Sequence, residues 1–209
     1  MRIYDNKYLS VTSIVNLRDP FDDTSFKNWC LKMGKNASLI SATSRILGSK
    51  VSEVLDNHSK GLDWLTAPPI DDLEARLLEG VEDFLKHYDL IETEKKVVCD
   101  KLHYAGTMDG KIVYKKTKEV ILADWKTFGA YKEKPYKRDS KKIKHTRWQL
   151  TMYAYAMNWK DSLGVVVFKN DGTWEIEKVK FDEGMLEWIV ENEGLILTTI
   201  QNEEDKVQP

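Results

Sequence analysis

Apolar residues recur every three or four positions over most of the first 90 residues, and this spacing predicts helices. The segment 25–58 is interrupted by turn residues at 34–36, so we expect two helices there. A further helix is expected to open at Asp71, because acidic residues favour the first turn and an apolar stripe follows. Residues 8–17 are apolar and β-branched, which predicts an opening strand or a strand and turn.

After residue 90 the pattern changes to short runs of β-forming residues separated by turns. Three runs predict an antiparallel meander, and Asn170-Asp171-Gly172 predicts a hairpin between two later strands. The expected elements are strands at 95–100, 111–114 and 119–125, a helix at 148–159, strands at 164–168 and 173–179, and one helix at about 182–200.

This order of elements is typical of an α/β fold with an antiparallel front and an N-terminal helical layer. No repeat or low-complexity linker divides the chain, so we expect one domain over residues 1–209. Within it we distinguish a mainly helical part (1–90), a part with the sheet and a motif-bearing helix (91–180), and a C-terminal helix with an acidic tail (181–209).

Composition narrows the possible classes of protein. No stretch approaches the roughly 18 apolar residues of a membrane helix, and the N-terminus lacks the apolar region of a signal peptide, so we expect a soluble cytoplasmic protein. Cys30 and Cys99 have no neighbouring Cys or His, which argues against a disulfide framework, a zinc site or an iron–sulfur cluster.

The formal net charge of −2 conceals an uneven distribution. Residues 131–147 contain eight Lys or Arg and two acids, whereas residues 181–209 contain one base and eight acids. Basic residues interleaved with tyrosines are typical of a channel for single-stranded nucleic acid, although most charged runs are solvated loops. The candidate DNA-binding residues in this run are Lys132, Lys134, Lys137, Arg138, Lys141, Lys142, Lys144 and Arg147.

Two carboxylates and a lysine are the candidate chemical groups. Asp124 and Lys126 follow a buried-looking strand and lie two residues apart, so their side chains leave the same face while Trp125 points away. Asp109, flanked by Gly106 and Gly110, is expected at a strand end, where hairpin pairing brings it beside Asp124. Adjacent carboxylates share a proton or bind a hard cation such as Mg²⁺ or Mn²⁺. The alternative is a surface ion pair worth at most about 1 kcal/mol.

Three motifs in this order carry a resemblance: Gly106-Thr-Met-Asp109, Leu122-Ala-Asp124-Trp-Lys126-Thr127 and Gln149-Leu-Thr-Met-Tyr153. The set resembles the RecB-like branch of the PD-(D/E)XK nuclease superfamily. It is most similar to phage and archaeal-virus exonucleases, the mitochondrial genome maintenance exonuclease and CRISPR-associated RecB-type nucleases. The segments Tyr8–Val15 and Trp29–Glu53 extend the resemblance upstream.

The resemblance implies a restriction-endonuclease-like core, a mixed central sheet flanked by helices, and a set of functional residues. Asp109, Asp124 and the backbone carbonyl of Trp125 match metal ligands, and Lys126 matches the catalytic lysine. Gln149 and Tyr153 match residues that support the site and contact DNA, and they share one helical face; the alternative for Tyr153 is core packing.

One motif departs from the family pattern. Ser52 stands where many relatives carry a metal-ligating His, which makes Glu53 the candidate acid on this helix and Ser52 a candidate DNA contact. A site with one metal ion, or one supported by Glu53, is therefore more plausible than a His-ligated site. Glu94 also falls where relatives often carry a glutamate. CRISPR-associated relatives hold an iron–sulfur cluster through cysteines near the C-terminus, and this C-terminus has none, so no cluster is expected.

The resulting hypothesis is a divalent-metal-dependent deoxyribonuclease that hydrolyses phosphodiester bonds, with exonuclease activity on single-stranded DNA or strand ends in viral or phage recombination, repair or genome processing. A viral protein of this kind acts in the host cell cytoplasm. A structure- or sequence-directed endonuclease and a non-catalytic DNA-binding module are the alternatives. Some relatives form rings, so a homo-oligomer is compatible with the resemblance.

Overall fold

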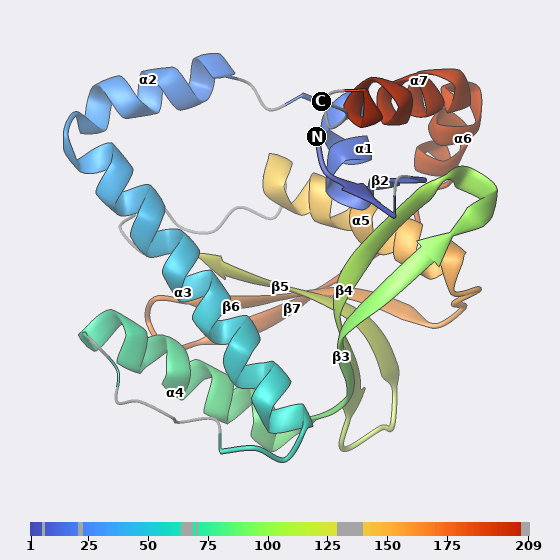
Figure 1. Ribbon diagram of the computed structural model, residues 1–209. Helices are drawn as coiled ribbons and strands as arrows, with labels where there is room; N and C mark the ends of the chain where they lie inside the picture. Colours follow the sequence, from blue (N-terminus) through green and yellow to red (C-terminus); the bar gives the residue numbers. More distant parts are fainter. Residues whose placement is uncertain (6, 21–22, 64–68, 70, 129–139, 206–209) are drawn as a thin grey trace.

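The computed structural model describes residues 1–5, 7–20, 23–63, 69, 71–128 and 140–205 (Figure 1). Its elements, in chain order, are β1 (Ile3–Tyr4), β2 (Tyr8–Ser10), α1 (Val11–Arg18), α2 (Asp23–Met33), α3 (Asn36–Ser59), α4 (Asp72–His87), β3 (Tyr88–Cys99), a 3₁₀ turn (Asp100–Leu102), β4 (Tyr104–Tyr114), β5 (Val120–Phe128), α5 (Lys141–Ala156), β6 (Ser162–Lys169), β7 (Trp174–Val179), α6 (Glu183–Glu191) and α7 (Glu193–Glu204). Within the described ranges, every helix is too short or too polar to cross a membrane.

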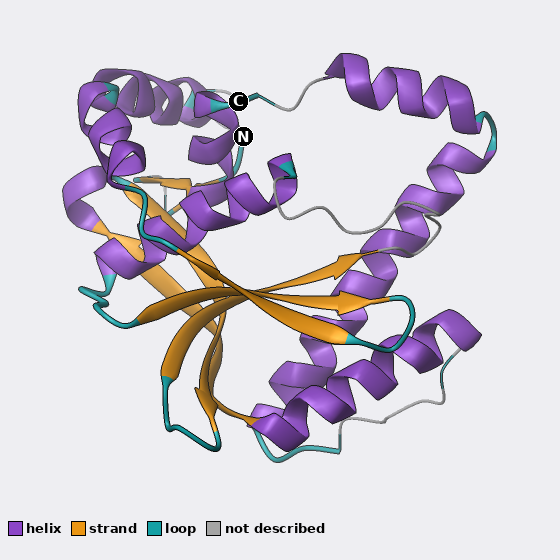
Figure 2. Ribbon diagram, turned by 180° about the vertical axis from the view of Figure 1, so that it is seen from behind, coloured by secondary structure: helices purple, strands orange, loops and turns teal. Residues whose placement is uncertain are grey.

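A seven-stranded mixed sheet forms the centre of the molecule, in the order β1-β2-β4-β5-β6-β7, with β3 also paired to β4. The pairs β2–β4 and β5–β6 are parallel, whereas β3–β4, β4–β5 and β6–β7 are antiparallel. Helices α3 and α4 pack on one side, and α1, α5, α6 and α7 gather on the other (Figures 1 and 2). The expected mixed sheet flanked by helices, with a helical N-terminal part, is confirmed.

Alternation along β5 divides its side chains between two hydrophobic cores. Ile121, Ala123 and Trp125 belong to the core beneath α3 and α4, whereas Leu122 belongs to the core beneath α5. Because successive side chains of a strand point to opposite faces, Asp124 and Lys126 follow Leu122 and Trp125 points the other way, as the sequence predicts.

Five elements differ from the sequence-based expectation. Strand β3 begins at Tyr88, seven residues before the expected start at 95. Residues 11–18 form helix α1 rather than a strand, because the Ser10 hydroxyl accepts the backbone N–H of Ser13 at 3.0 Å and caps the helix. Gly106 and Gly110 lie inside β4 rather than at a strand end. Helix α5 begins seven residues earlier than expected, at Lys141. The single C-terminal helix is two helices, α6 and α7, which meet at Asn192.

Candidate active site

A pocket of about 750 Å³ lies between α3 and the strands β3, β4 and β5. The sheet contributes Asp109 from β4 and Trp125 and Lys126 from β5. Helix α3 contributes a face of small and polar residues spaced by three and four. The lining residues are Ser44, Arg45, Gly48, Ser49, Ser52, Glu53, Asp56, Glu94, Asp109, Trp125, Lys126, Thr127 and Lys142.

The β4–β5 pairing ends beside the two predicted carboxylates. The antiparallel ladder runs from Val113 opposite Val120 to Gly110 opposite Ala123, so the next opposed positions are Asp109 and Asp124. Instead of continuing the ladder, Asp109 accepts a 2.8 Å hydrogen bond from the backbone N–H of Trp125 through its side-chain oxygen Oδ2. The backbone pairing of β4 and β5 therefore ends just before the two aspartates, which occupy opposed positions. The prediction that hairpin pairing brings Asp109 beside Asp124 is confirmed.

Burial makes the charges of this group interdependent. Asp124 is 4% exposed, and its Oδ1 forms a salt bridge with the Nζ of Lys126. Burial, and then repulsion by the Asp124 carboxylate, raise the pKa of Asp109 to about 7. Burial alone lowers the pKa of Lys126, but the attraction of Asp124 and Asp109 outweighs it and raises that pKa, which keeps the lysine charged.

The donor set at this point fits a hard divalent cation. Asp109 and Asp124 supply carboxylate oxygens, and the repulsion that raises the pKa of Asp109 is the kind that a cation offsets. Over the described part of the chain, no group of three or more His, Cys, Asp and Glu is placed to hold a metal ion. Two carboxylates nevertheless suit Mg²⁺, which is commonly held through one or two carboxylates while it keeps several waters.

Helix α3 carries Ser52 and Glu53, the motif that departs from the family pattern, and places both in the same pocket. Ser52 is half-buried and Glu53 is exposed, and both line the cavity. Asp56, one turn further on, also lines it and accepts a 2.7 Å hydrogen bond from the Thr93 hydroxyl. We did not predict Asp56, although its spacing of four from Ser52 is the signal that could have identified it.

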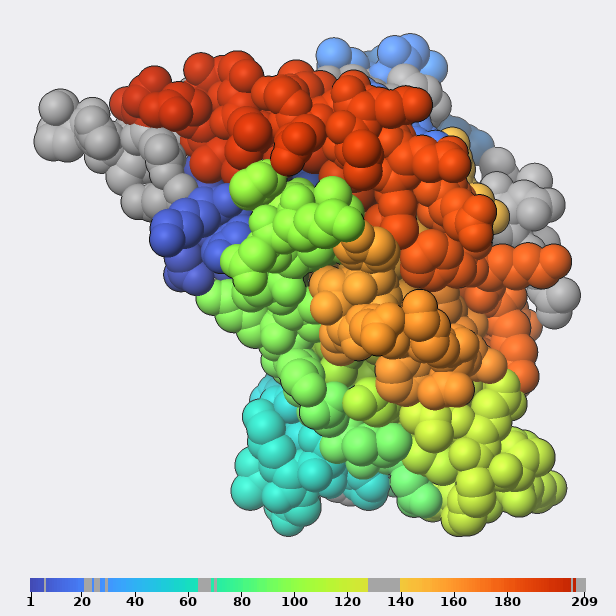
Figure 3. All heavy atoms as spheres, turned by 90° about the vertical axis from the view of Figure 1, so that its right-hand side faces the viewer, coloured from blue at the N-terminus to red at the C-terminus, as the bar shows by residue number. Residues whose placement is uncertain are grey.

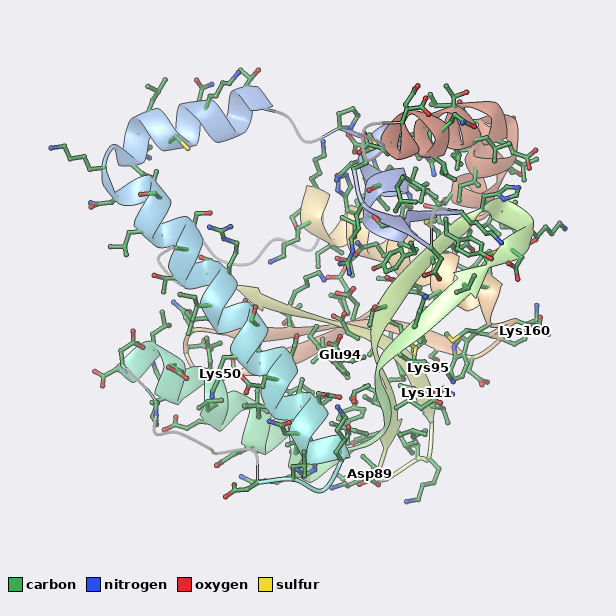
Figure 4. The ribbon with its side chains drawn as sticks, viewed as in Figure 1. Lys50, Asp89, Glu94, Lys95, Lys111 and Lys160 are labelled. Carbon is green, nitrogen blue, oxygen red and sulfur yellow. The ribbon has the colours of Figure 1, made fainter. Side chains whose placement is uncertain are left out.

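Glu94 occupies a special position in β3. Its backbone φ is 48°, in the left-handed region that non-glycine residues seldom adopt. Figure 4 shows Glu94 in the space between α3 and the sheet, where burial and then the Asp56 carboxylate raise the pKa of its side chain. A glutamate held in this conformation against other acids is consistent with a role in the site.

Gln149 and Tyr153 do not line this pocket, but Tyr153 lies near its acids: burial, and then the charges of Asp124 and Asp109, raise the pKa of its hydroxyl. Tyr153 lines a second pocket of about 510 Å³, which also includes Arg2, Thr12 and Glu94. Its hydroxyl donates to the carbonyl of Thr107 at 2.9 Å, and the side-chain amide of Gln149 donates to the Thr12 hydroxyl at 3.1 Å. The pair therefore fastens α5 to β4 and α1. The second pocket was not predicted from the sequence.

The members of the predicted basic run, residues 131–147, differ in where the structure places them. Lys132, Lys134, Lys137 and Arg138 fall outside the described residues. Lys141 and Lys144 pair with Asp19 at 2.8 and 3.2 Å, and Arg147 pairs with Asp182. Lys142 lines the main pocket, where its Nζ donates to the Thr127 carbonyl at 3.2 Å. Of the four described members, Lys142 is the one that the fold brings to the predicted site.

Comparison with known proteins gives distant structural matches. No family model matches the sequence, and no curated protein matches it. The crystal structure of SSO0001 is 16% identical, with 93% of this chain and 78% of that chain covered and a TM-score of 0.44. The crystal structure of LHK-Exo in complex with dAMP is 10% identical, with 97% and 92% covered and a TM-score of 0.48. At these values the two similarities do not identify a function.

Proposed function

We propose that the protein is a divalent-metal-dependent deoxyribonuclease whose active site is formed by Asp109, Asp124 and Lys126. The observation that carries the proposal is the separation of β4 and β5 at the two aspartates, where Asp109 and Lys126 line the pocket and Lys126 pairs with the buried Asp124. A structural ion pair at a strand end would need neither the second carboxylate nor a pocket of about 750 Å³ beside it.

Each residue has a chemical role in this proposal. Asp109 and Asp124, with the backbone carbonyl of Trp125, would hold Mg²⁺ or Mn²⁺, which supplies a bound water of lowered pKa and polarises a phosphoryl oxygen. Lys126 places a fixed positive charge beside the scissile phosphate, where charge develops in the transition state. The Trp125 N–H keeps the Asp109 carboxylate oriented, so that little reorganisation is needed during the reaction.

Three further residues of the pocket are proposed to act near the substrate: Glu53, Ser52 and Lys142. Glu53 is an acid on the α3 side of the pocket, and Ser52 and Lys142 offer a hydroxyl and a cation to DNA phosphates. Gln149 and Tyr153 act as positioning residues, because they hold α5 against β4 and α1.

We further propose exonuclease action on single-stranded DNA. An assay that tests the proposal supplies linear and circular single-stranded DNA of one sequence, with Mg²⁺, Mn²⁺ or EDTA. Loss of the linear form in either metal, an intact circle and no cleavage in EDTA are expected. Cleavage of the circle would replace exonuclease with endonuclease action, whereas binding of DNA without cleavage in any metal would leave a non-catalytic binding module.

A further inference from the structure

A basic segment without acids follows Asp23, the first residue of α2, and covers the rest of α2 and the first two-thirds of α3. Residues 24–52 contain five basic residues and no Asp or Glu, in a chain that has 34 acids among 209 residues. The five are Lys27, Lys32, Lys35, Arg45 and Lys50. We call residues 24–52 the α2–α3 arm. Such a segment attracts polyanions, because no acid within it offsets its charge.

The arm projects from the body of the molecule and leads to the pocket. Figures 1 and 2 show α2 and the start of α3 standing apart from the sheet. Helix α3 has 24 residues and is therefore about 36 Å long. Its later part lines the main pocket through Arg45, Ser49 and Ser52. One helix thus connects the outer end of the arm to the candidate active site.

The cations of the arm differ from the other described basic residues near the pocket. Lys27, Lys32, Lys35 and Arg45 are exposed, and no acidic side chain that the structure describes pairs with them. Lys141 and Lys144, by contrast, already pair with Asp19. The charge of the arm is therefore available to an external anion, whereas much of the charge at the start of α5 is neutralised within the protein.

Exposed apolar side chains accompany these cations. Leu31 is 80% exposed, Leu39 62% and Ile46 61%. A DNA duplex hides the faces of its bases, whereas a single strand exposes them beside its phosphates. A surface on which exposed cations, paired with no described acid, lie beside exposed apolar groups therefore suits a single strand better than a duplex.

We propose that the α2–α3 arm binds single-stranded nucleic acid and directs the strand along α3 into the pocket. This inference rests on the proposed function only in making that strand the substrate. The alternative occupant is a second copy of this chain, docking through the acidic surface of α6, where Glu183, Glu187 and Glu191 recur every four residues. Figure 3 shows α6 and α7 along one edge of the molecular surface. A nucleic acid is favoured, because the basic surface continues into the pocket through Arg45.

The test compares two triple variants that change the net charge equally. The arm variant carries Lys27→Glu, Lys32→Glu and Lys35→Glu; the control carries Lys101→Glu, Lys116→Glu and Lys160→Glu, at exposed lysines outside the arm. Figure 4 places Lys160 across the molecule from α3. Binding of a labelled oligo-dT is measured in EDTA over a range of salt concentrations, so that cleavage does not enter the measurement. Thermal unfolding is expected to be the same for both variants.

The arm variant is expected to reduce the slope of log affinity against log salt by about 2, since each lost phosphate contact on a single strand removes about 0.7. The control is expected to keep the wild-type slope. Equal slopes for both variants, or a wild type that binds no oligo-dT, would overturn the inference. So would an arm variant that changes a dimer to a monomer at unchanged DNA affinity, because a second copy would then be the partner.

The apolar part of the surface has its own test. Leu39→Ser with Ile46→Ser is expected to weaken oligo-dT binding at an unchanged salt slope, and wild type is expected to bind oligo-dT more tightly than a duplex of equal length. Equal affinity for duplex would overturn the single-strand assignment. DNA binding through the arm without cleavage in Mg²⁺ or Mn²⁺ would support this inference while removing the proposed function, so the two can fail separately.

Discussion

The backbone N–H of Trp125 donates a 2.8 Å hydrogen bond to the carboxylate of Asp109, one residue beyond the last paired position of β4 and β5. The side chain of Asp109 thereby takes the place of a strand carbonyl and stays beside Asp124. This placement has an electrostatic cost: burial, and then repulsion by the Asp124 carboxylate, raise the pKa of Asp109 to about 7. Lys126 compensates part of the charge through its salt bridge to Asp124.

The metal-free protein should lose stability as the pH rises from about 4 to about 7. In this window folded Asp109 holds a proton that the unfolded chain has released, because its pKa rises from 3.8 to about 7 on folding. Asp109→Asn removes this titration. Relative to Asp109→Asn, wild type in EDTA should lose on the order of 3–4 kcal/mol between pH 4 and 8 and then stay constant. Chemical denaturation at several pH values measures the difference.

The matched control for this pH profile is Asp161→Asn, which changes an exposed aspartate. Its stability should follow wild type at every pH. If the free energy of unfolding of wild type ran parallel to that of Asp109→Asn between pH 4 and 7, Asp109 would titrate normally in the folded protein.

Added Mg²⁺ or Mn²⁺ should stabilise the wild-type protein at pH 8 and should not stabilise Asp109→Asn. A cation that binds only the folded state adds about 2.7 kcal/mol at a concentration of 100 times its Kd. The thermal unfolding midpoint, followed as each metal is titrated, measures this effect. An equal shift in wild type and Asp109→Asn would place the bound metal elsewhere in the protein.

Gly110→Ala should destabilise the protein by about 1–3 kcal/mol. A Cβ at Gly110 would lie 2.3 Å from the ring of Trp125, and that residue is only 5% exposed, so the ring or β4 must shift. Gly194→Ala is the control: its Cβ meets nothing within 4 Å in helix α7, and it should stabilise by about 0.5–1 kcal/mol. Urea unfolding measures both changes in stability. An unchanged stability of Gly110→Ala would show that β4 and the Trp125 ring on β5 pack less closely than described.

Tyr153→Phe should destabilise by about 1–2 kcal/mol, because it removes the donor to the Thr107 carbonyl. Tyr155→Phe on the same helix removes the hydroxyl of a half-buried tyrosine and should have a smaller effect. If Tyr153 positions the site, its substitution should also lower kcat with little change in KM. Unchanged stability and kcat would leave its hydroxyl without a role.

The sequence predicted best those features that depend on residue periodicity and on neighbouring elements of the chain. The apolar stripe after Asp71 predicts α4, and the same-face spacing of Asp124 and Lys126 follows from the strand period. The hairpin between β4 and β5 then predicts that Asp109 meets Asp124. These three features need only periodicity and one short connection.

Other features depend on contacts between segments distant in the sequence. Gly106 and Gly110 resemble turn glycines locally, but they lie within β4, where the rings of Tyr153 and Trp125 occupy the space that a Cβ would need. Thr12 and Val15 have strand propensity, yet the cap at Ser10 begins a helix instead. Asp19 neutralises Lys141 and Lys144 from a segment more than 120 residues away, which no local charge count anticipates.

The most direct test of the proposed active site is cleavage of end-labelled single-stranded DNA in Mg²⁺ or Mn²⁺ by wild type, Asp124→Asn, Lys126→Ala and the Asp161→Asn control. Wild type and control should cleave at equal rates, EDTA should abolish cleavage, and the two site variants should be slower by about 100-fold or more. Wild-type rates in Asp124→Asn or Lys126→Ala, or cleavage that persists in EDTA, would contradict a metal-dependent nuclease site at these residues.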